Sequence, residues 1–160
     1  MIREMQESDI AAINAGFAAM GWPQRPRVLA QYWAEQQAGS RRVFIAEIDG
    51  QVAGYLTLLP KALHGPWAGQ LPELADFNVF AAFRQHGVGT ALMAAAEQAA
   101  GLPVTLGVGL HPGYGPAQRL YVRRGYVPDG SGVWLDGKRP VAEDTVAPVA
   151  DLVLYMKKVQ

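Results

Sequence analysis

The sequence of 160 residues contains no cysteine, which excludes disulfides, thiolate metal sites and a cysteine nucleophile. It has no run of lysine or arginine longer than a pair, and its 14 basic residues balance its 14 acidic residues. A broad positive surface for nucleic acid or for an anionic membrane is therefore not expected. Any chemistry must come from other groups.

Long apolar runs are also missing, because no stretch approaches the roughly 18 residues that a membrane span needs. The first residues include Arg3, Glu4, Glu7 and Asp9 rather than a basic segment followed by an apolar one. We therefore expect a cytoplasmic protein with no membrane partner. The chain is the size of one ordinary domain, and its 50% hydrophobic residues can form a substantial core. We therefore expect residues 1–160 to form a single domain.

Two familiar ligand-binding patterns are absent. No third glycine completes a GxGxxG fingerprint, and no GxxxxGK(S/T) sequence occurs, so a Rossmann or P-loop interpretation is weak. The three histidines, His64, His86 and His111, are scattered and do not form a metal-binding spacing. No metal site is expected.

The order of predicted elements indicates a mixed α/β sheet covered by helices. The clearest local signal is Asp49-Gly50, which suits a tight hairpin turn between strands at 42–47 and 51–59. The other predicted elements are strands at 1–5, 71–79, 104–108, 125–127, 133–135 and 151–156, and helices near 9–20, 26–38, 88–100 and 116–124. Turn chemistry is expected at 129–132, and Leu92, Ala95, Ala96 and Ala99 are expected to form the packed face of the 88–100 helix.

The stretch from Arg84 to Leu92 reads RQHGVGTAL and lies between a predicted strand and a predicted helix. Gly87 and Gly89 allow a tight turn with outward amides, and the start of the helix adds free amides and the positive end of its dipole. Such a turn suits a phosphate-bearing ligand. The same pattern also occurs as a plain structural turn, so both readings stay open at this point.

A second stretch, from Ala117 to Tyr126, reads AQRLYVRRGY. The two stretches together resemble the GNAT-type N-acetyltransferases, whose motifs are R/Q-x-x-G-x-G/A and AxxLYxxxGF. The resemblance implies a mixed, mostly antiparallel sheet of about seven strands flanked by about four helices. One departure concerns Tyr114, which stands where the family often has asparagine, so hydrogen bonding after the fifth strand is expected to differ.

The resemblance also implies acetyl-CoA as the co-substrate. Backbone amides from Gln85 to Thr90 would cradle its pyrophosphate, with Arg84 beside the phosphates or, alternatively, solvated at the surface. Val79 is the preferred backbone contact for the pantetheine arm, although Phe77 and Val79 could equally be core residues. The expected coenzyme-binding set is Phe77, Val79, Arg84, Gln85, His86, Gly87, Val88, Gly89 and Thr90.

Transfer of an acetyl group to an amine needs a base, since an alkylammonium has a pKa of about 10.4. Glu73 and Asp76 are the candidate bases, and strand alternation would place them on opposite faces. His111 is a third candidate, which could instead be a structural loop residue. The resemblance places Tyr121 near the coenzyme sulfur, where its phenol would assist the departing thiolate or would only pack.

The acceptor is expected to meet the link 22–26, the loop 61–70 and a late loop that carries Glu143 and Asp144. Trp22, Trp67 and Trp134 would form aromatic walls or cover the edge of the core. We expect direct attack by a small-molecule or amino-acid-like amine in a ternary complex. A protein acetyltransferase and a non-catalytic acyl-CoA-binding module are the alternatives, and pairing of the last strand could give a homodimer.

Overall fold

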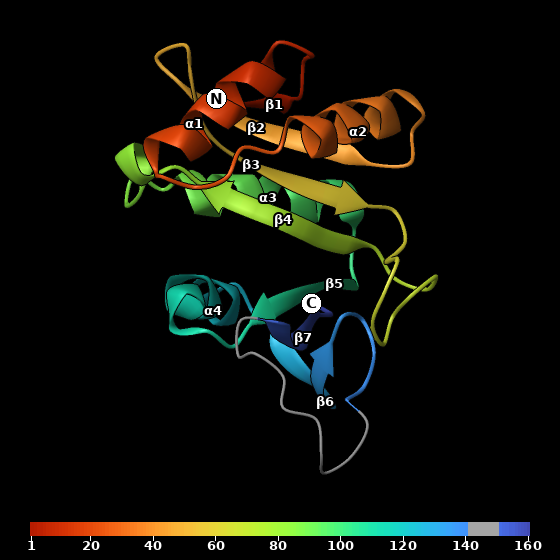
Figure 1. Cartoon of the computed structure of the whole chain (residues 1–160). Coiled ribbons are helices and arrows are strands. Elements are labelled where there is room, and N and C mark those ends of the chain that lie inside the picture. The colour runs from red at the N-terminus through yellow and green to blue at the C-terminus, as the bar shows by residue number, and fades with distance from the viewer. Residues whose placement is uncertain (141–150) are drawn as a thin grey trace. The chain divides into compact units, whose positions relative to one another are not determined.

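The computed structural model describes residues 1–140 and 151–160 and contains, within them, seven strands, four α-helices and two short 3-10 helices (Figure 1). In chain order these are β1 Ile2–Glu4, α1 Asp9–Ala19, α2 Pro26–Gln37, β2 Arg42–Ile48, β3 Gln51–Leu59, β4 Glu73–Val79, η1 Ala81–Phe83, α3 Val88–Ala100, β5 Val104–Gly109, η2 Pro112–Tyr114, α4 Gly115–Arg123, β6 Val127–Leu135 and β7 Leu152–Lys158. The expected mixed α/β class is confirmed.

The elements form two compact units. The first comprises Met1–Leu59 and Leu74–Ala99, and the second comprises Pro60–Glu73 and Ala100–Gln160. None of the helices that the structure describes combines the length and the apolar character of a membrane span.

Strands β1 to β4 lie in sequence order in the first unit, and β1–β2 and β2–β3 pair antiparallel. The hairpin turn is confirmed, since Asp49 and Gly50 have φ values of 49° and 74°, both in the left-handed region that a tight hairpin turn requires. Strand β4 also runs antiparallel to β3: the Phe80 N–H donates to the Ala53 carbonyl, while Thr57 Oγ1, farther along β3, donates to the Ala75 carbonyl.

Both faces of this sheet are covered, which explains the nearly continuous apolar runs of β2 and β3. Helices α1 and α2 pack on one face, where they share a core of Met5, Ile13, Phe17, Leu29, Val43, Ile45, Tyr55 and Phe80. Helix α3 is drawn behind the strands in Figure 1.

The packed face of α3 differs from the expected one. Leu92 and Ala96 are buried as predicted, but Ala99 is exposed, and Met93 and Glu97 are buried instead. The buried stripe of the helix is therefore rotated toward its larger side chains, which can fill more of the space beside the sheet.

In the second unit, β7 lies between β5 and β6 and pairs antiparallel with both. The prediction of a turn at 129–132 that separates two short strands was wrong, because β6 runs as one strand from Val127 to Leu135. Its register with β7 breaks between Pro128 and Val133, where Gly130 and Gly132 have positive φ. The glycines thus make an irregularity within a strand.

Candidate functional site

The loop before α3 has the backbone of an anion site. Gln85 and Gly87 adopt left-handed conformations, with φ of 64° and 77°, and α3 begins at Val88. The Ala91 N–H donates to the Gly87 carbonyl over 3.0 Å and makes the first hydrogen bond of the helix. The N–H groups of Val88, Gly89 and Thr90 come before it and have no acceptor within the helix. These amides and the helix dipole favour negative charge at this end.

Side chains of the loop leave this backbone accessible. Arg84, Gln85 and His86 are exposed, and no atom within the described residues would contact a Cβ added at Gly87 within 4 Å. Arg84 Nε donates to the Val79 carbonyl over 3.1 Å, while His86 Nδ1 lies 2.8 Å from the Arg84 carbonyl and therefore carries its proton toward it. The arginine fork is thus held at the end of β4.

Strand β4 is irregular at Asp76, whose φ of 48° lies in the left-handed region although it is not glycine. Alternation of side chains along the strand, which was used to separate Glu73 from Asp76, does not continue through such a residue. Phe77 and Val79, the two predicted backbone contacts, are half-buried beyond the break. No signal in the sequence indicated this conformation.

The carboxylate of Asp76 is surrounded by hydrogen-bond donors. Oδ2 accepts from the Arg25 guanidinium and, over 3.0 Å, from the Tyr55 hydroxyl, and Oδ1 accepts from Asn78 Nδ2 over 3.0 Å. Burial and then the Asp76 charge raise the pKa of Tyr55, and the same two causes raise the pKa of Tyr32 to about 12. These contacts favour an anchoring role for Asp76, because donors occupy both of its oxygens.

Tyr121 lies in α4 and is buried. Burial, followed by the proximity of Tyr114, raises its pKa well above the ordinary tyrosine value, so the phenol is protonated at neutral pH and is a weaker acid than an exposed tyrosine. Its ring contacts Tyr126 with centroids 6.0 Å apart.

Tyr114, which stands where the family often has asparagine, packs its ring at the end of β5. A Cβ on Gly109 would lie 2.4 Å from the Tyr114 ring, so this ring covers the end of β5. Gln118 Nε2 donates to the Gly109 carbonyl over 2.9 Å and so supplies a side-chain hydrogen bond between α4 and β5.

His111 caps the short helix η2. Its Nδ1 accepts from the Gly113 N–H over 2.9 Å, which leaves the proton of a neutral ring on Nε2. The ring also meets Tyr114 edge-on, with centroids 6.4 Å apart. This geometry matches the structural alternative for His111, and its role as a base stays a prediction.

The indoles of the second unit have partners within the protein. Trp67 Nε1 donates to Asp129 over 3.0 Å and Lys157 Nζ lies 4.3 Å from the Trp67 ring, while Trp134 Nε1 donates to Ser131 over 2.7 Å. The contacts of Trp67 and Trp134 are thus with other residues of the protein. They match the alternative prediction, in which these side chains cover the edge of the core rather than form aromatic walls for the acceptor.

Glu73 is half-buried at the start of β4. Burial first, and then the charges of Glu73 and Asp129, raise the pKa of Tyr155 on β7. Trp22, in the first unit, stacks on Phe17. The predicted acceptor residues Glu143 and Asp144 lie outside the described residues.

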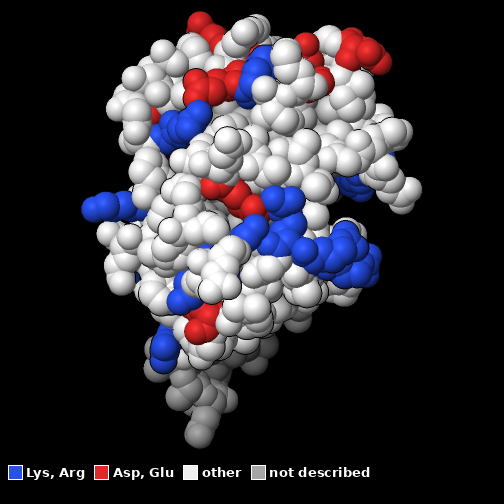
Figure 2. Space-filling model, turned by 180° about the vertical axis from the view of Figure 1, so that it is seen from behind, with Lys and Arg blue, Asp and Glu red and all other residues white. Residues whose placement is uncertain are grey.

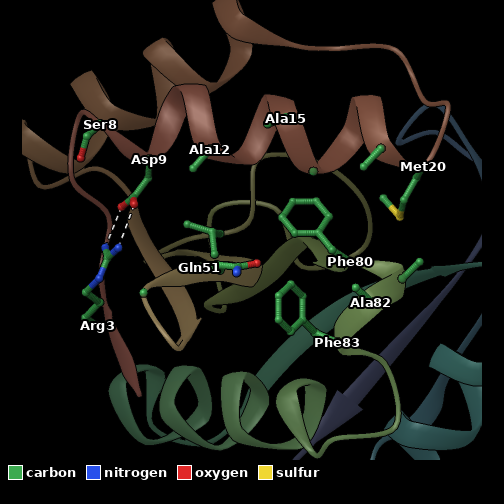
Figure 3. A pocket seen from close by; sticks show the side chains of 15 residues that line it. Arg3, Ser8, Asp9, Ala12, Ala15, Met20, Gln51, Phe80, Ala82 and Phe83 are labelled. Atoms are coloured by element: carbon green, nitrogen blue, oxygen red, sulfur yellow. Dashed lines mark hydrogen bonds and ion pairs between the residues drawn. The ribbon is translucent and has the colours of Figure 1, made fainter.

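A hollow of about 780 Å³ in the first unit involves none of the predicted site residues (Figure 3). Small residues of α1 form one wall, the rings of Phe80 and Phe83 project into it, and Met20 lies at one end. The other end is closed by Arg3, which donates two hydrogen bonds to Asp9.

Charged side chains of both signs lie on the face shown in Figure 2. Acidic side chains interrupt the basic ones, so no single charge sign covers that face.

Comparisons with known proteins agree with the predicted family. A model of the acetyltransferase (GNAT) family matches residues 8–126. A search of curated proteins gave no significant match.

Among solved structures, a ribosomal-protein-alanine N-acetyltransferase from Brucella melitensis is 20% identical, with a TM-score of 0.70 and coverage of 100% of this chain and 99% of that one. A spermidine N-acetyltransferase chimera from Vibrio cholerae and hSSAT is 14% identical, with a TM-score of 0.69 and coverage of 99% and 94%. The putative acetyltransferase yncA from Salmonella typhimurium, solved with its cofactor acetyl-CoA, is 20% identical, with a TM-score of 0.65 and coverage of 99% and 92%.

Proposed function

Since the chain belongs to the GNAT acetyltransferase family, we propose that it moves the acetyl group of acetyl-CoA to a primary amine of a small-molecule or amino-acid-like acceptor. The observation that carries this proposal is the loop from Gln85 to Thr90, in which two left-handed residues lead into the first amides of α3. We further propose that residues 1–160 act as one acetyltransferase domain, that it works in the cytoplasm, and that it needs no metal.

The loop fits the coenzyme because its backbone, rather than its side chains, supplies the donors. Amides from Gln85 to Thr90 would bind the pyrophosphate. Arg84 would add a charge-assisted contact from its remaining N–H groups. Backbone groups of Phe77 and Val79 would pair with the pantetheine arm. When bound, acetyl-CoA supplies a thioester carbonyl open to attack by an amine.

We propose that Glu73 removes the proton from the acceptor's ammonium, directly or through a water, so that the neutral amine can form the new C–N bond as the C–S bond breaks. Tyr121 donates its phenolic proton, or a hydrogen bond, to the departing sulfur. The raised pKa of Tyr121 keeps the phenol protonated and makes it a weaker acid, so it favours a hydrogen bond to the sulfur over complete proton transfer. Asp76 and His111 are the alternative bases, and the contacts of both favour structural roles.

An acceptor panel tests the function. Release of free CoA thiol would be measured with acetyl-CoA and polyamines, aminoglycosides, free amino acids, lysine peptides and peptides with free N-termini, after calorimetry has established acetyl-CoA binding. We expect acceptor-dependent thiol release with a small amine. Release with peptides alone would instead assign a protein acetyltransferase, as among the solved relatives. Binding with no release from any acceptor would assign a regulatory module.

Two variants test the assigned roles. Tyr121→Phe should lower kcat by roughly 10²-fold without changing acetyl-CoA binding, whereas Tyr126→Phe, which alters the neighbouring buried tyrosine, should leave kcat within a few fold. Glu73→Gln should lower kcat most at neutral pH, and an acceptor that is already largely neutral should be less sensitive to it. Near wild-type turnover by Tyr121→Phe would remove its assignment.

A further inference from the structure

The break in β4 lies directly before the backbone that we assign to the pantetheine arm. Directly before it, the Ala75 carbonyl accepts a hydrogen bond from the Thr57 hydroxyl over 2.9 Å, and after it the Phe80 N–H donates to the Ala53 carbonyl over 3.0 Å. Between these two points stands Asp76 at φ 48°. A left-handed residue inside a strand re-aims the amides and carbonyls that follow it.

Strand β3 accommodates this path closely. A Cβ added at Gly54 would lie 2.5 Å from the Asn78 carbonyl oxygen and 3.1 Å from the Val79 Cα. Only glycine therefore allows the irregular backbone of β4 to approach at this point. The conformation of β4 therefore depends on Gly54 of β3 as well as on Asp76.

The side chain of Asp76 is held from two further elements. Arg25, from the link before α2, and Tyr55, from β3, both donate to its Oδ2. Arg25 is itself fixed: its N–H donates to Asn14 Oδ1 over 2.7 Å, and its guanidinium lies 5.1 Å from the centroid of the Phe17 ring. Hydrogen bonds thus connect the half-buried Asp76 directly to β3 and to the link between α1 and α2, and through Arg25 to α1.

A second buried chain of polar groups supports the same stretch. Glu35 on α2 accepts from Arg41 Nε, Arg41 Nη1 donates to Thr57 Oγ1 over 2.8 Å, and Thr57 donates to Ala75. Tyr55 and Thr57 project from the same face of β3, two residues apart, and each holds a successive residue of β4.

We propose that Asp76, Arg25 and Tyr55 form a positioning cluster that holds β4 in its broken conformation and so sets the backbone of Phe77 to Val79 for the pantetheine arm of the coenzyme. This inference rests on the proposed function. It makes Asp76 a positioning residue rather than the general base, and it brings in Arg25 and Tyr55, which no motif indicated.

The experiment separates the two halves of the coenzyme. Calorimetry would measure the Kd of acetyl-CoA and of 3′-phosphoadenosine 5′-diphosphate, which keeps the nucleotide and pyrophosphate but has no pantetheine arm. The variants Asp76→Asn, Arg25→Gln and Tyr55→Phe should weaken acetyl-CoA binding about five- to thirtyfold and leave nucleotide binding within twofold. Arg27→Gln, which changes an exposed arginine in the first turn of α2 near Arg25, is the matched control and should change neither Kd.

Folding is monitored by circular dichroism for every variant. If Arg25→Gln fails to fold, Arg25→Lys provides a milder change, because it keeps the charge but replaces the guanidinium, whose Nη2 donates to both Asp76 and Tyr55, with a smaller ammonium. The Asp76→Asn and Arg25→Gln effects on acetyl-CoA binding should not add in the double variant, since the two residues act through one contact.

The outcomes distinguish the two proposals. Equal weakening of both ligands, or no weakening of either, overturns the positioning role and leaves the proposed function standing. A lower kcat for Asp76→Asn with unchanged acetyl-CoA affinity assigns proton transfer to Asp76 and also overturns it. If the wild-type protein binds neither ligand, the proposed function fails, and the positioning role fails with it.

Discussion

Gly87 offers the sharpest test of the coenzyme loop, because its φ of 77° is strained for any residue with a Cβ and yet no described atom lies within 4 Å of the position that a Cβ would take. Gly87→Ala therefore adds backbone strain without a clash in the free protein. A left-handed conformation costs an L-residue about 1–2 kcal/mol. That strain lowers either the free energy of unfolding or the affinity for a ligand that requires the same loop conformation.

The exposed loop can relax to negative φ when it is free, and the strain then returns when the ligand binds. We therefore expect Gly87→Ala to weaken acetyl-CoA binding about five- to thirtyfold, which is the factor that corresponds to 1–2 kcal/mol. Isothermal titration calorimetry measures this change. The affinity for 3′-phosphoadenosine 5′-diphosphate should fall by the same factor, because the loop is assigned to the pyrophosphate.

Gly39 provides a matched control. It has φ of 75°, nothing within 4 Å of an added Cβ, and a place after α2, where its N–H donates to the Gln36 carbonyl over 3.1 Å. Gly39→Ala should lower the Tm by roughly 2–8 °C, since 1 kcal/mol corresponds to about 2–4 °C in a protein of this size, and should leave the acetyl-CoA Kd unchanged.

A third variant separates strain from obstruction by the new side chain. Asparagine tolerates the left-handed region better than alanine, so Gly87→Asn should recover part of the affinity if strain is the cause. An Asn variant that binds less tightly than the Ala variant would indicate obstruction of the phosphates. If Gly87→Ala binds acetyl-CoA as tightly as the wild-type protein does, the assignment of this loop to the pyrophosphate is refuted.

Three further predictions concern stability and can be checked by urea denaturation. Gly54→Ala places a Cβ 2.5 Å from the Asn78 carbonyl oxygen and should destabilise the protein by about 1–3 kcal/mol, and an unchanged midpoint would contradict the close approach of β3 and β4. Leu92→Ala removes a fully buried side chain from α3 and should cost about 2–5 kcal/mol, so a loss below 1 kcal/mol would contradict that packing. Burial disfavours the charged form of Glu35, but the hydrogen bonds from Arg41 and Gln31 and the charge of Arg41 together outweigh this and lower its pKa below 4.5. The stabilisation is therefore complete above pH 4.5 and is lost as the pH falls through the lowered pKa, so the wild-type advantage over Glu35→Gln should shrink below about pH 4.5, and a constant difference would argue against the pair.

Elements whose signals are local could be predicted from the sequence. The hairpin at Asp49-Gly50 and the helix from Val88 to Ala100 were located correctly, because turn residues and strong helix formers act over a few neighbouring residues. The GNAT-like sequence from Arg84 to Gly89 was recognisable for the same reason, since its glycine turn and the following helix are contiguous in the chain.

The tertiary structure decided which side chains the irregular backbone of the site depends on. Asp76 and Gln85 are left-handed although neither is glycine, and two of the partners of Asp76, Arg25 and Tyr55, stand 51 and 21 residues away in the sequence. The strand-like run around Asp76 predicts extended backbone there, whereas the folded chain holds its side chain by hydrogen bonds from distant residues, so no window of the sequence could show the outcome. The residue types and the motif order determined the family and predicted the loop that we assign to the phosphates, whereas only the folded chain, by bringing distant donors to one carboxylate, decided the path of the strand before that loop.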